Sequence, residues 1–335
     1  MNHELIPINL DKFIINKDIA DKLKNINKDN MVHTLFYGKC NSGKKTLMKA
    51  LINNIFNTNI DETACLSNVE LKIGNNKVNI EYILSKYHLE INLYEYGLYD
   101  KNIITDFLEE HVKYNNINYN CKKYIIIHHL ENSSISAQRC LRKLLETYYS
   151  NSVFIFISEE ITKIEKGLLS RLMKIRVPSP STKEITHYID YLSKTYHKIS
   201  ILNKKALVKH GKNDLFIITK AYIDLKNNKK IDLTKLDIID EKIKEIIQLV
   251  NKPNIKSIIE IRKLSYDLLL ININTKYILK RLLNYYMNSD ILTDSSKFKL
   301  VDFSSTIQHK QSKIEHDIIC LEFFILKVKK LLLNN

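Results

Sequence analysis

Glycine and proline are scarce in this sequence, with six and four residues among 335. That scarcity excludes long irregular stretches and favours a mostly helical protein with short connections. Closely paired cysteines, which would indicate a disulfide framework or a zinc knuckle, are also missing. The five cysteines are scattered, at Cys40, Cys65, Cys121, Cys140 and Cys320. We therefore expect a reduced, intracellular setting.

Long apolar runs are absent as well. Residues 1–12 contain no basic-then-apolar segment typical of a secretory signal, and no run approaches the length that spans a bilayer. The sequence therefore predicts a soluble protein. A chain of 335 residues can bury a sizeable core, and two or three domains are expected.

Acidic residues are outnumbered. There are 52 Lys and Arg against 37 Asp and Glu, which gives a net charge of +15 spread along the chain. Such a balance favours a polyanionic partner, for example a nucleic acid. A chain this rich in Lys, Asn and Ile is also what an AT-rich genome encodes, so the charge alone leaves both explanations open.

Apolar periodicity divides the chain. Short β-rich runs alternate with helical patterns up to about Val177, and this alternation predicts a parallel sheet flanked by helices. The expected strands are Thr34–Tyr37, Tyr87–Ile91, Tyr124–His128 and Val153–Ile157. After Pro180, amphipathic helical segments continue to Leu333. We expect an α/β domain at 1–177, a small helical domain at 178–235 and a second helical domain at 236–335.

A glycine-containing loop follows the first expected strand and precedes a helical run. It consists of Gly38, Lys39, Cys40, Asn41, Ser42, Gly43, Lys44, Lys45 and Thr46. In this context the pattern is typical of a phosphate-binding loop, whose backbone N–H groups converge on phosphate oxygens. Lys44 would reach the outer phosphates, helped by the positive end of the following helix. The alternative is a strand-to-helix turn that binds no ligand.

Two positions depart from an active ATPase. The residue after the loop lysine is ordinarily Ser or Thr, whose hydroxyl holds Mg²⁺, but here it is Lys45, and Thr46 comes one place later. The apolar strand that ordinarily ends in Asp-Glu ends in His128 and His129. Consecutive residues at a strand end point to opposite faces, so we do not expect this pair to bind zinc, and we expect Glu131 to be structural. Hydrolysis at this pocket should be weak or absent.

Two further basic features have alternative interpretations. The stretch Ser136–Tyr149 predicts an amphipathic helix, with Arg139, Arg142 and Lys143 opposite the apolar face. These residues form either a solvated face or contacts with a nucleic-acid backbone. Arg171 follows the last expected strand, where a lone arginine usually makes a surface salt bridge.

Four stretches, taken in order, point to one known family: Gly43–Thr46, Ser85–Asn92, Ser136–Gln138 with Leu141–Lys143, and Leu169–Leu172 with Val177–Ser181. They resemble the small subunits of replication factor C, which are AAA+ ATPases. In particular, the chain is similar to the subunit class whose phosphate loop ends in Gly-Lys-Lys-Thr. The resemblance spans nearly the whole chain.

The resemblance implies a RecA-like AAA+ domain, a helical lid and a helical collar. It also implies a ring of five different subunits that opens a sliding clamp (PCNA) and places it on primer–template DNA. In this class the pocket for ATP or ADP is thought to be structural. Arg171 occupies the position of an arginine that acts on the ATP of a neighbouring subunit, and Leu172 replaces the family cysteine. Such a chain would work in a nucleus or at the cytoplasmic replication site of a large DNA virus.

Other family positions are also replaced. The asparagine that senses the γ-phosphate aligns with Glu159, or with Ser158 if the alignment slips by one residue, and the sensor arginine of the lid falls at Phe216. Three roles are therefore considered. The first is a clamp-loader subunit that binds nucleotide without hydrolysing it efficiently. The others are an ATP-hydrolysing AAA+ subunit and a purely architectural subunit with an empty pocket.

Overall fold

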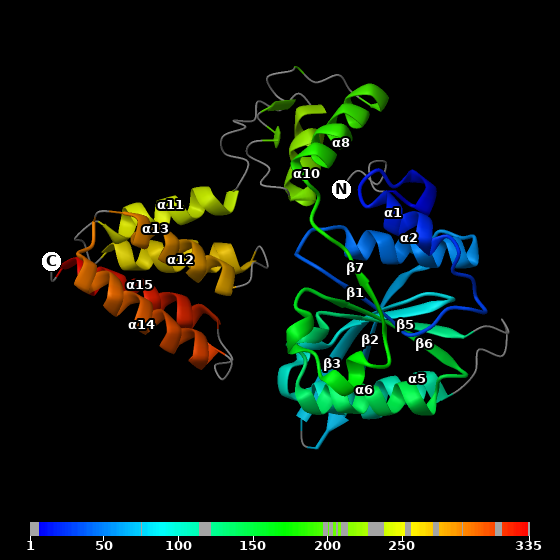
Figure 1. Cartoon of the computed structure of the whole chain (residues 1–335). Helices are drawn as coiled ribbons and strands as arrows, with labels where there is room; N and C mark the ends of the chain where they lie inside the picture. Colours follow the sequence, from blue (N-terminus) through cyan, green and yellow to red (C-terminus); the bar gives the residue numbers. More distant parts are fainter. Residues whose placement is uncertain are drawn as a thin grey trace. The chain divides into compact units, whose positions relative to one another are not determined.

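The computed structural model describes most of the chain. The described residues are 7–74, 76–113, 122–196, 200, 204–205, 207–208, 214–226, 238–251, 256–270, 275–289, 291–311 and 317–333. The chain divides into two compact units, residues 1–230 and 231–335. The described part of the first unit combines a sheet with helices, and that of the second is helical (Figure 1).

One seven-stranded sheet organises the first unit, with the order β2-β3-β4-β5-β6-β1-β7. Strands β4, β5, β6, β1 and β7 are parallel, whereas β2 and β3 are antiparallel to each other and β3 is antiparallel to β4. The strands are β1 (Thr34–Tyr37), β2 (Cys65–Ile73), β3 (Asn76–Leu84), β4 (His88–Asn92), β5 (Lys123–His128), β6 (Ser152–Ser158) and β7 (Met173–Arg176). All four expected strands are present, as β1, β4, β5 and β6, with ends within one residue of the expected ones.

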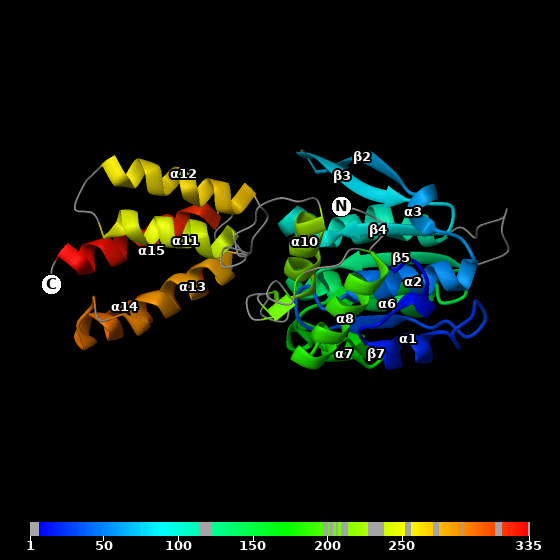
Figure 2. The ribbon, with the colours of Figure 1, turned by 90° about the horizontal axis from the view of Figure 1, so that it is seen from above.

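The sequence does not predict the remaining strands, so the expectation of a purely parallel sheet is corrected. The β2–β3 hairpin extends one edge of the sheet and β7 forms the other (Figure 2). Strand β2 has only exposed and half-exposed residues, and β7 has only four residues. Because neither strand has a run of buried apolar residues, the apolar pattern gives little sign of them.

Helices cover both faces of the sheet (Figure 1). Alternate residues of β5 divide between the two cores: Tyr124 and Ile126 pack with α1 and α2, whereas Ile125 and Ile127 pack with α6. The helical segments of this α/β part are η2 (Leu10–Lys12), α1 (Lys17–Leu23), α2 (Lys44–Phe56), α3 (Ile60–Thr63), η3 (Leu93–Tyr99), α4 (Asp100–Asn102), the π-helical η4 (Ile103–Leu108), α5 (Glu109–Lys113), η5 (Leu130–Asn132), α6 (Ile135–Thr147), η6 (Ile161–Lys163) and α7 (Lys166–Leu169).

Two longer helices follow β7, namely α8 (Thr182–Thr195) and α10 (Leu215–Lys226). A capping box between Ser181 and Glu184 begins α8. The carboxylate of Asp214 accepts the N–H groups of Phe216 and Ile217 and so begins α10. Elsewhere in the expected small helical domain, several stretches, among them the boundary at 235, lie outside the described residues.

The second unit has a helical core of its own. Its helices are α11 (Ile238–Val250), α12 (Lys256–Leu270), α13 (Thr275–Asn288), α14 (Asp294–Gln311) and α15 (Asp317–Leu333). Apolar side chains from all five pack together, including Ile246, Ile261, Leu282, Leu300 and Phe324. Among the described residues, no helix combines the length and apolarity needed to cross a membrane.

Candidate nucleotide site

The loop from Gly38 to Gly43 connects β1 to α2, as the sequence predicts. Gly43 lies in the left-handed region, with φ of 92°, and immediately precedes α2, so the free N–H groups of that helix begin at the loop. The N–H of Gly38 donates to the carbonyl of Ser158 at the end of β6, 3.2 Å away. The hydroxyl of Ser42 is buried and has no hydrogen-bond partner among the described residues. A buried hydroxyl without a partner fits a loop that receives a ligand.

Lys44 lies across this loop. It is only 7 % exposed, and its Nζ donates to the carbonyl oxygens of Gly38 and Lys39 at 2.7 and 2.6 Å. Burial lowers the pKa of Lys44, and the carboxylates of Glu159 and Glu131 offset this lowering only in part. The loop therefore holds a cation at its centre through contacts that a phosphate could replace.

Carboxylates lie at two positions around the loop. Glu159 follows β6 directly, and Asp214 Oδ2 accepts a hydrogen bond of 2.9 Å from Asn41 Nδ2, which ties the start of α10 to the loop. Phe216, where the resemblance places the lid arginine, is 44 % exposed. The residues aligned with the family sensors therefore bring no positive charge, and Glu159 and Asp214 add negative charge beside the phosphate loop.

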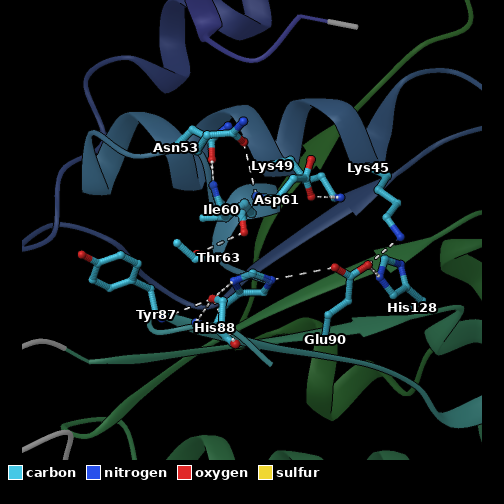
Figure 3. Close-up of polar contacts among 12 residues, drawn as sticks. Lys45, Lys49, Asn53, Ile60, Asp61, Thr63, Tyr87, His88, Glu90 and His128 are labelled. Atoms are coloured by element: carbon cyan, nitrogen blue, oxygen red, sulfur yellow. Dashed lines mark hydrogen bonds and ion pairs between the residues drawn. The ribbon is translucent and has the colours of Figure 1, made fainter. Parts of the chain in front are cut away.

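A buried carboxylate links α2 to the sheet (Figure 3). Glu90 on β4 is 3 % exposed, and its Oε1 lies 2.6 Å from Lys45 Nζ and 2.5 Å from His128 Nε2. Its other oxygen, Oε2, lies 4.0 Å from His88 Nε2. Lys45 is in the first turn of α2, and His128 points toward α2 because it shares the face of β5 with Ile126.

Charge balance in this cluster follows from the contacts. Burial raises the pKa of Glu90, but the hydrogen bond from His128 and the charge of Lys45 outweigh it, and the pKa is lowered overall. Burial lowers the pKa of His128 despite the nearby carboxylate. We therefore describe Glu90 as ionised, Lys45 as its counter-ion and the neutral imidazole of His128 as an N–H donor to it.

The residues present do not form a Mg²⁺ site of the kind that AAA+ ATPases use. An ammonium stands at the loop position that ordinarily carries a hydroxyl, and an imidazole stands at the strand end that ordinarily carries a carboxylate. The nearby carboxylate oxygen Oε1 of Glu90 already accepts from both Lys45 and His128. Hard divalent cations prefer oxygen ligands, and the two positions that ordinarily supply them carry nitrogen groups here, in Lys45 and His128.

The second histidine of the strand end, His129, contacts Glu131 and not Glu90. His129 has a left-handed backbone, with φ of 51°, and its Nδ1 lies 3.8 Å from Glu131 Oε1. The same oxygen of Glu131 accepts the N–H of Glu159 at 3.1 Å. Burial raises the pKa of Glu131. The contact with His129 and the backbone hydrogen bonds outweigh that effect, so the pKa is lowered overall and the carboxylate is ionised. Among the described residues, no group of three His, Cys, Asp or Glu side chains could hold a metal ion.

Arg171 lies in the short connection between α7 and β7. Its side chain is 42 % exposed, and its Nε donates to Glu146 on α6. Its Nη1 donates to the carbonyl of Gly167 at 2.7 Å and to Ser170 Oγ at 3.2 Å. Leu172 is buried in the core of the sheet. Arg171 is therefore held in place within its own subunit and remains accessible from outside.

The basic helix forms as expected, as α6. Its apolar face is buried, and Arg139, Arg142 and Lys143 lie on the other side. Glu165 reduces the positive charge of this face, since its Oε1 lies 3.6 Å from Arg139 Nε and 3.3 Å from Arg142 Nη1. Lys143 is exposed and has no recorded ion-pair partner in the described part of the chain.

Comparison with known proteins shows which families the chain is similar to. A family model described as "Replication factor C subunit 3, C-terminal domain" matches residues 236–335, and one described as "DNA polymerase III, delta subunit" matches residues 15–181. Replication factor C subunit 3 of Arabidopsis thaliana is 25 % identical, over 98 % of this chain and 96 % of the relative. This chain is similar over nearly its whole length to the replication factor C small subunits.

Other replication factor C relatives come from a fungus and a virus. Subunit 5 of Saccharomyces cerevisiae is 26 % identical, over 96 % of both chains. A putative replication factor C small subunit of Acanthamoeba polyphaga mimivirus is 25 % identical, over 96 % of this chain and 88 % of the relative. Among solved structures, a DNA polymerase III gamma subunit-related protein of Thermotoga maritima has a TM-score of 0.48 and 15 % identity, over 93 % of this chain and 99 % of that one.

The similarity to replication factor C supports an AAA+ clamp-loader subunit of a multi-subunit complex that acts in DNA replication. Two acidic residues of the site, Glu90 and Asp214, are not among those predicted from the sequence. Glu90 carried a usable signal, because it is a lone charge in the expected strand Tyr87–Ile91, and a charge buried in a sheet requires a partner. Asp214 gave no comparable signal, since its contact with Asn41 joins positions far apart in the sequence.

Proposed function

We propose that this chain is a replication factor C-type subunit that binds ATP or ADP without hydrolysing it efficiently. In this proposal it supplies Arg171 to the ATP site of a neighbour and basic residues to DNA. The observation that carries the proposal is the contrast within one helix turn of α2. Lys44 and its loop keep the form of a phosphate site, whereas Lys45 is paired with Glu90 and leaves no hydroxyl for a metal.

The nucleotide would be held by the loop, Gly38 to Thr46. Backbone N–H groups at the start of α2 and the ammonium of Lys44 are the groups that would face the phosphates. No carboxylate stands at the end of β5 to orient water, and Glu131 is engaged by His129 and by the N–H of Glu159. The chain's own residues therefore favour retention of nucleotide over its hydrolysis.

Lys44→Ala is expected to lower the affinity of the purified chain for ATP and ADP by about 10- to 100-fold, because a charge-assisted contact to phosphate is lost. Titration of a fluorescent nucleotide measures this. Lys49→Ala is the matched control, since Lys49 lies on the same helix and pairs with Asp61 instead. Equal affinities of Lys44→Ala and wild type would contradict the proposal, and ATP turnover by the isolated chain that disappears in Lys44→Ala would favour a hydrolysing subunit.

Arg171 supports the proposed action on a neighbour. An arginine finger works by neutralising charge that develops on the transferred phosphate, and it must project from its own subunit. Arg171 combines 42 % exposure with anchoring to Glu146, Gly167 and Ser170. An exposed arginine that serves only as a surface salt bridge is the simpler alternative.

The face of α6 supports the proposed DNA contact. Phosphate contacts require accessible Arg or Lys side chains and carry no sequence preference. Arg139 and Lys143 are exposed, and Arg142 is half-buried beside Glu165. Primer–template DNA is the proposed ligand of the assembled ring.

In the assembled complex, Arg139→Ala combined with Arg142→Ala is expected to weaken DNA binding. The plot of log affinity against log salt should become less steep by roughly 2, because two phosphate contacts are lost. A control that removes the same charge is Lys72→Ala with Lys77→Ala on the β2–β3 hairpin. A salt slope that stays at the wild-type value, or falls equally in the control, would contradict a specific role for this face.

The remaining elements of the proposal concern assembly. The partners would be the other subunits of a hetero-pentameric clamp loader and a sliding clamp (PCNA), with residues 1–177, 178–235 and 236–335 as AAA+, lid and collar domains. The site of action would be a nucleus or a cytoplasmic viral replication site. Co-purification from the native source, with mass spectrometry of partners and bound nucleotide, tests these points together.

A purely architectural role is the second candidate function. It is favoured by the carboxylates of Glu159 and Asp214, which lie beside the loop and would repel a polyphosphate. Nucleotide retained through purification would exclude this role.

A further inference from the structure

We propose that Lys45 takes the place of the divalent cation in this pocket, so that the chain binds a nucleoside di- or triphosphate as the free anion. This inference rests on the proposed nucleotide binding and adds the chemical form of the ligand. AAA+ sites ordinarily take a nucleotide with Mg²⁺, whose ligands include the hydroxyl after the loop lysine. Here the chain provides a cation of its own at that position.

The first observation is the fixed position of the Lys45 ammonium. Its Nζ lies 2.6 Å from Glu90 Oε1, and Glu90 is only 3 % exposed. His128 Nε2 donates to the same oxygen at 2.5 Å, and Ser85 Oγ lies 2.5 Å from Nδ1 of the adjacent His88. The bond from His128 on β5 fixes the buried Glu90 of β4, and Glu90 holds Lys45 at the start of α2, one residue after Lys44 (Figure 3).

The second observation is that Lys45 retains access to a ligand. Its side chain is 52 % exposed, whereas its partner is buried. An ammonium has three N–H donors, and Glu90 is the one ion-pair partner recorded for it among the described residues. The remaining donors, together with Lys44 and the N-terminus of the 13-residue helix α2, can face phosphate oxygens.

The third observation is that a metal would be repelled. Entry of Mg²⁺ beside Glu90 would place a divalent charge close to a fixed ammonium, and it would have to displace a contact that neutralises a buried carboxylate. The other half of the site is the end of β5, which ordinarily provides a carboxylate. Here it provides the imidazole of His128. Both halves of the site therefore oppose the metal, by charge at Lys45 and by ligand type at His128.

The test compares nucleotide affinity with and without metal. The full-length chain is titrated with fluorescent ADP and ATP analogues in excess Mg²⁺ and in excess EDTA. We expect the two dissociation constants to agree within about twofold. A loss of about tenfold or more in EDTA would overturn the inference and leave the proposed nucleotide binding intact. Absence of binding under both conditions would overturn the inference together with the nucleotide-binding part of the proposed function.

Variants provide an independent measurement. Lys45→Thr combined with His128→Asp restores a hydroxyl and a carboxylate, and it is expected to bind nucleotide about tenfold or more tightly in Mg²⁺ than in EDTA. Lys49→Ala, the control on the same helix, should stay insensitive to the metal.

Folding of the double variant is checked by circular dichroism. If it does not fold, the single Lys45→Ala variant is used, which should lose affinity equally in Mg²⁺ and in EDTA. Mn²⁺ alone serves as a direct probe of the wild type. After free nucleotide and free metal are removed by gel filtration, the nucleotide-bound chain should carry no more Mn²⁺ in electron paramagnetic resonance than the nucleotide-free chain, and Mn²⁺ retained in proportion to the bound nucleotide would overturn the inference.

Discussion

Arg171→Ala is expected to slow ATP hydrolysis by the assembled complex while leaving assembly intact. Arginine fingers contribute roughly 10³-fold or more to turnover at the site they enter. The site that faces Arg171 should therefore hydrolyse almost no ATP in this variant. Turnover of the whole complex would fall by the share of that one site. The measurement is steady-state ATPase activity of the complex with clamp and DNA, together with size-exclusion chromatography to establish assembly.

The local geometry suggests two informative companions to this variant. Arg171→Lys keeps the charge but loses the planar fork of donors, so turnover should remain low. Glu146→Gln weakens the contact at Nε while the contacts to Gly167 and Ser170 remain. Its effect should be smaller than that of Arg171→Ala, because Glu146 positions the arginine and does not touch the nucleotide.

Lys166→Ala is the matched control, since Lys166 is an exposed cation on α7, just before Arg171. Turnover should match the wild type in this variant. If Arg171→Ala hydrolyses ATP as fast as the wild type, Arg171 is a surface salt bridge and no finger. If it fails to assemble, the role of Arg171 lies in the interface itself.

Much of the α/β fold could be predicted because its central strands are buried on both faces. Strands β1, β5 and β6 are apolar runs, and such runs indicate strands of a parallel sheet. The β2–β3 hairpin could not be predicted in this way. It has one buried residue, Ile80, and its stability comes from pairing with β4 and from packing of half-exposed side chains.

The candidate site likewise has a part that could be predicted from the sequence and a part that could not. The phosphate loop was predictable because glycines, a lysine and a following helix form a local pattern. The Lys45–Glu90–His128 cluster was only half predictable: the sequence shows which metal ligands are missing, but not that Glu90 on a neighbouring strand pairs with what replaces them. That pairing depends on strand order, because β4 lies beside β5 and their register places Asn92 opposite His128.

The second large effect is expected at the start of the phosphate loop. Gly38→Ala should destabilise the N-terminal unit, because a Cβ at this position would lie 2.1 Å from the carbonyl oxygen of Val177 and 3.1 Å from its carbonyl carbon. These are backbone atoms, and Val177 is fully buried and donates its N–H to Tyr37 at 2.8 Å, so they cannot move away readily. The free energy of unfolding should fall by about 3 kcal/mol, which corresponds to a melting temperature lower by roughly 6–12 °C.

Gly38→Ala should also weaken nucleotide binding, because the displaced loop would lose the bond from its N–H to Ser158 and the alignment of Lys44. Gly74→Ala is the control. Gly74 has a positive φ, of 60°, but a Cβ there meets nothing within 4 Å, so only the strain of a positive φ, about 1 kcal/mol, is expected. Differential scanning calorimetry and nucleotide titration distinguish the two. Equal destabilisation by both substitutions would show that backbone conformation, and not the contact with Val177, makes glycine necessary at position 38.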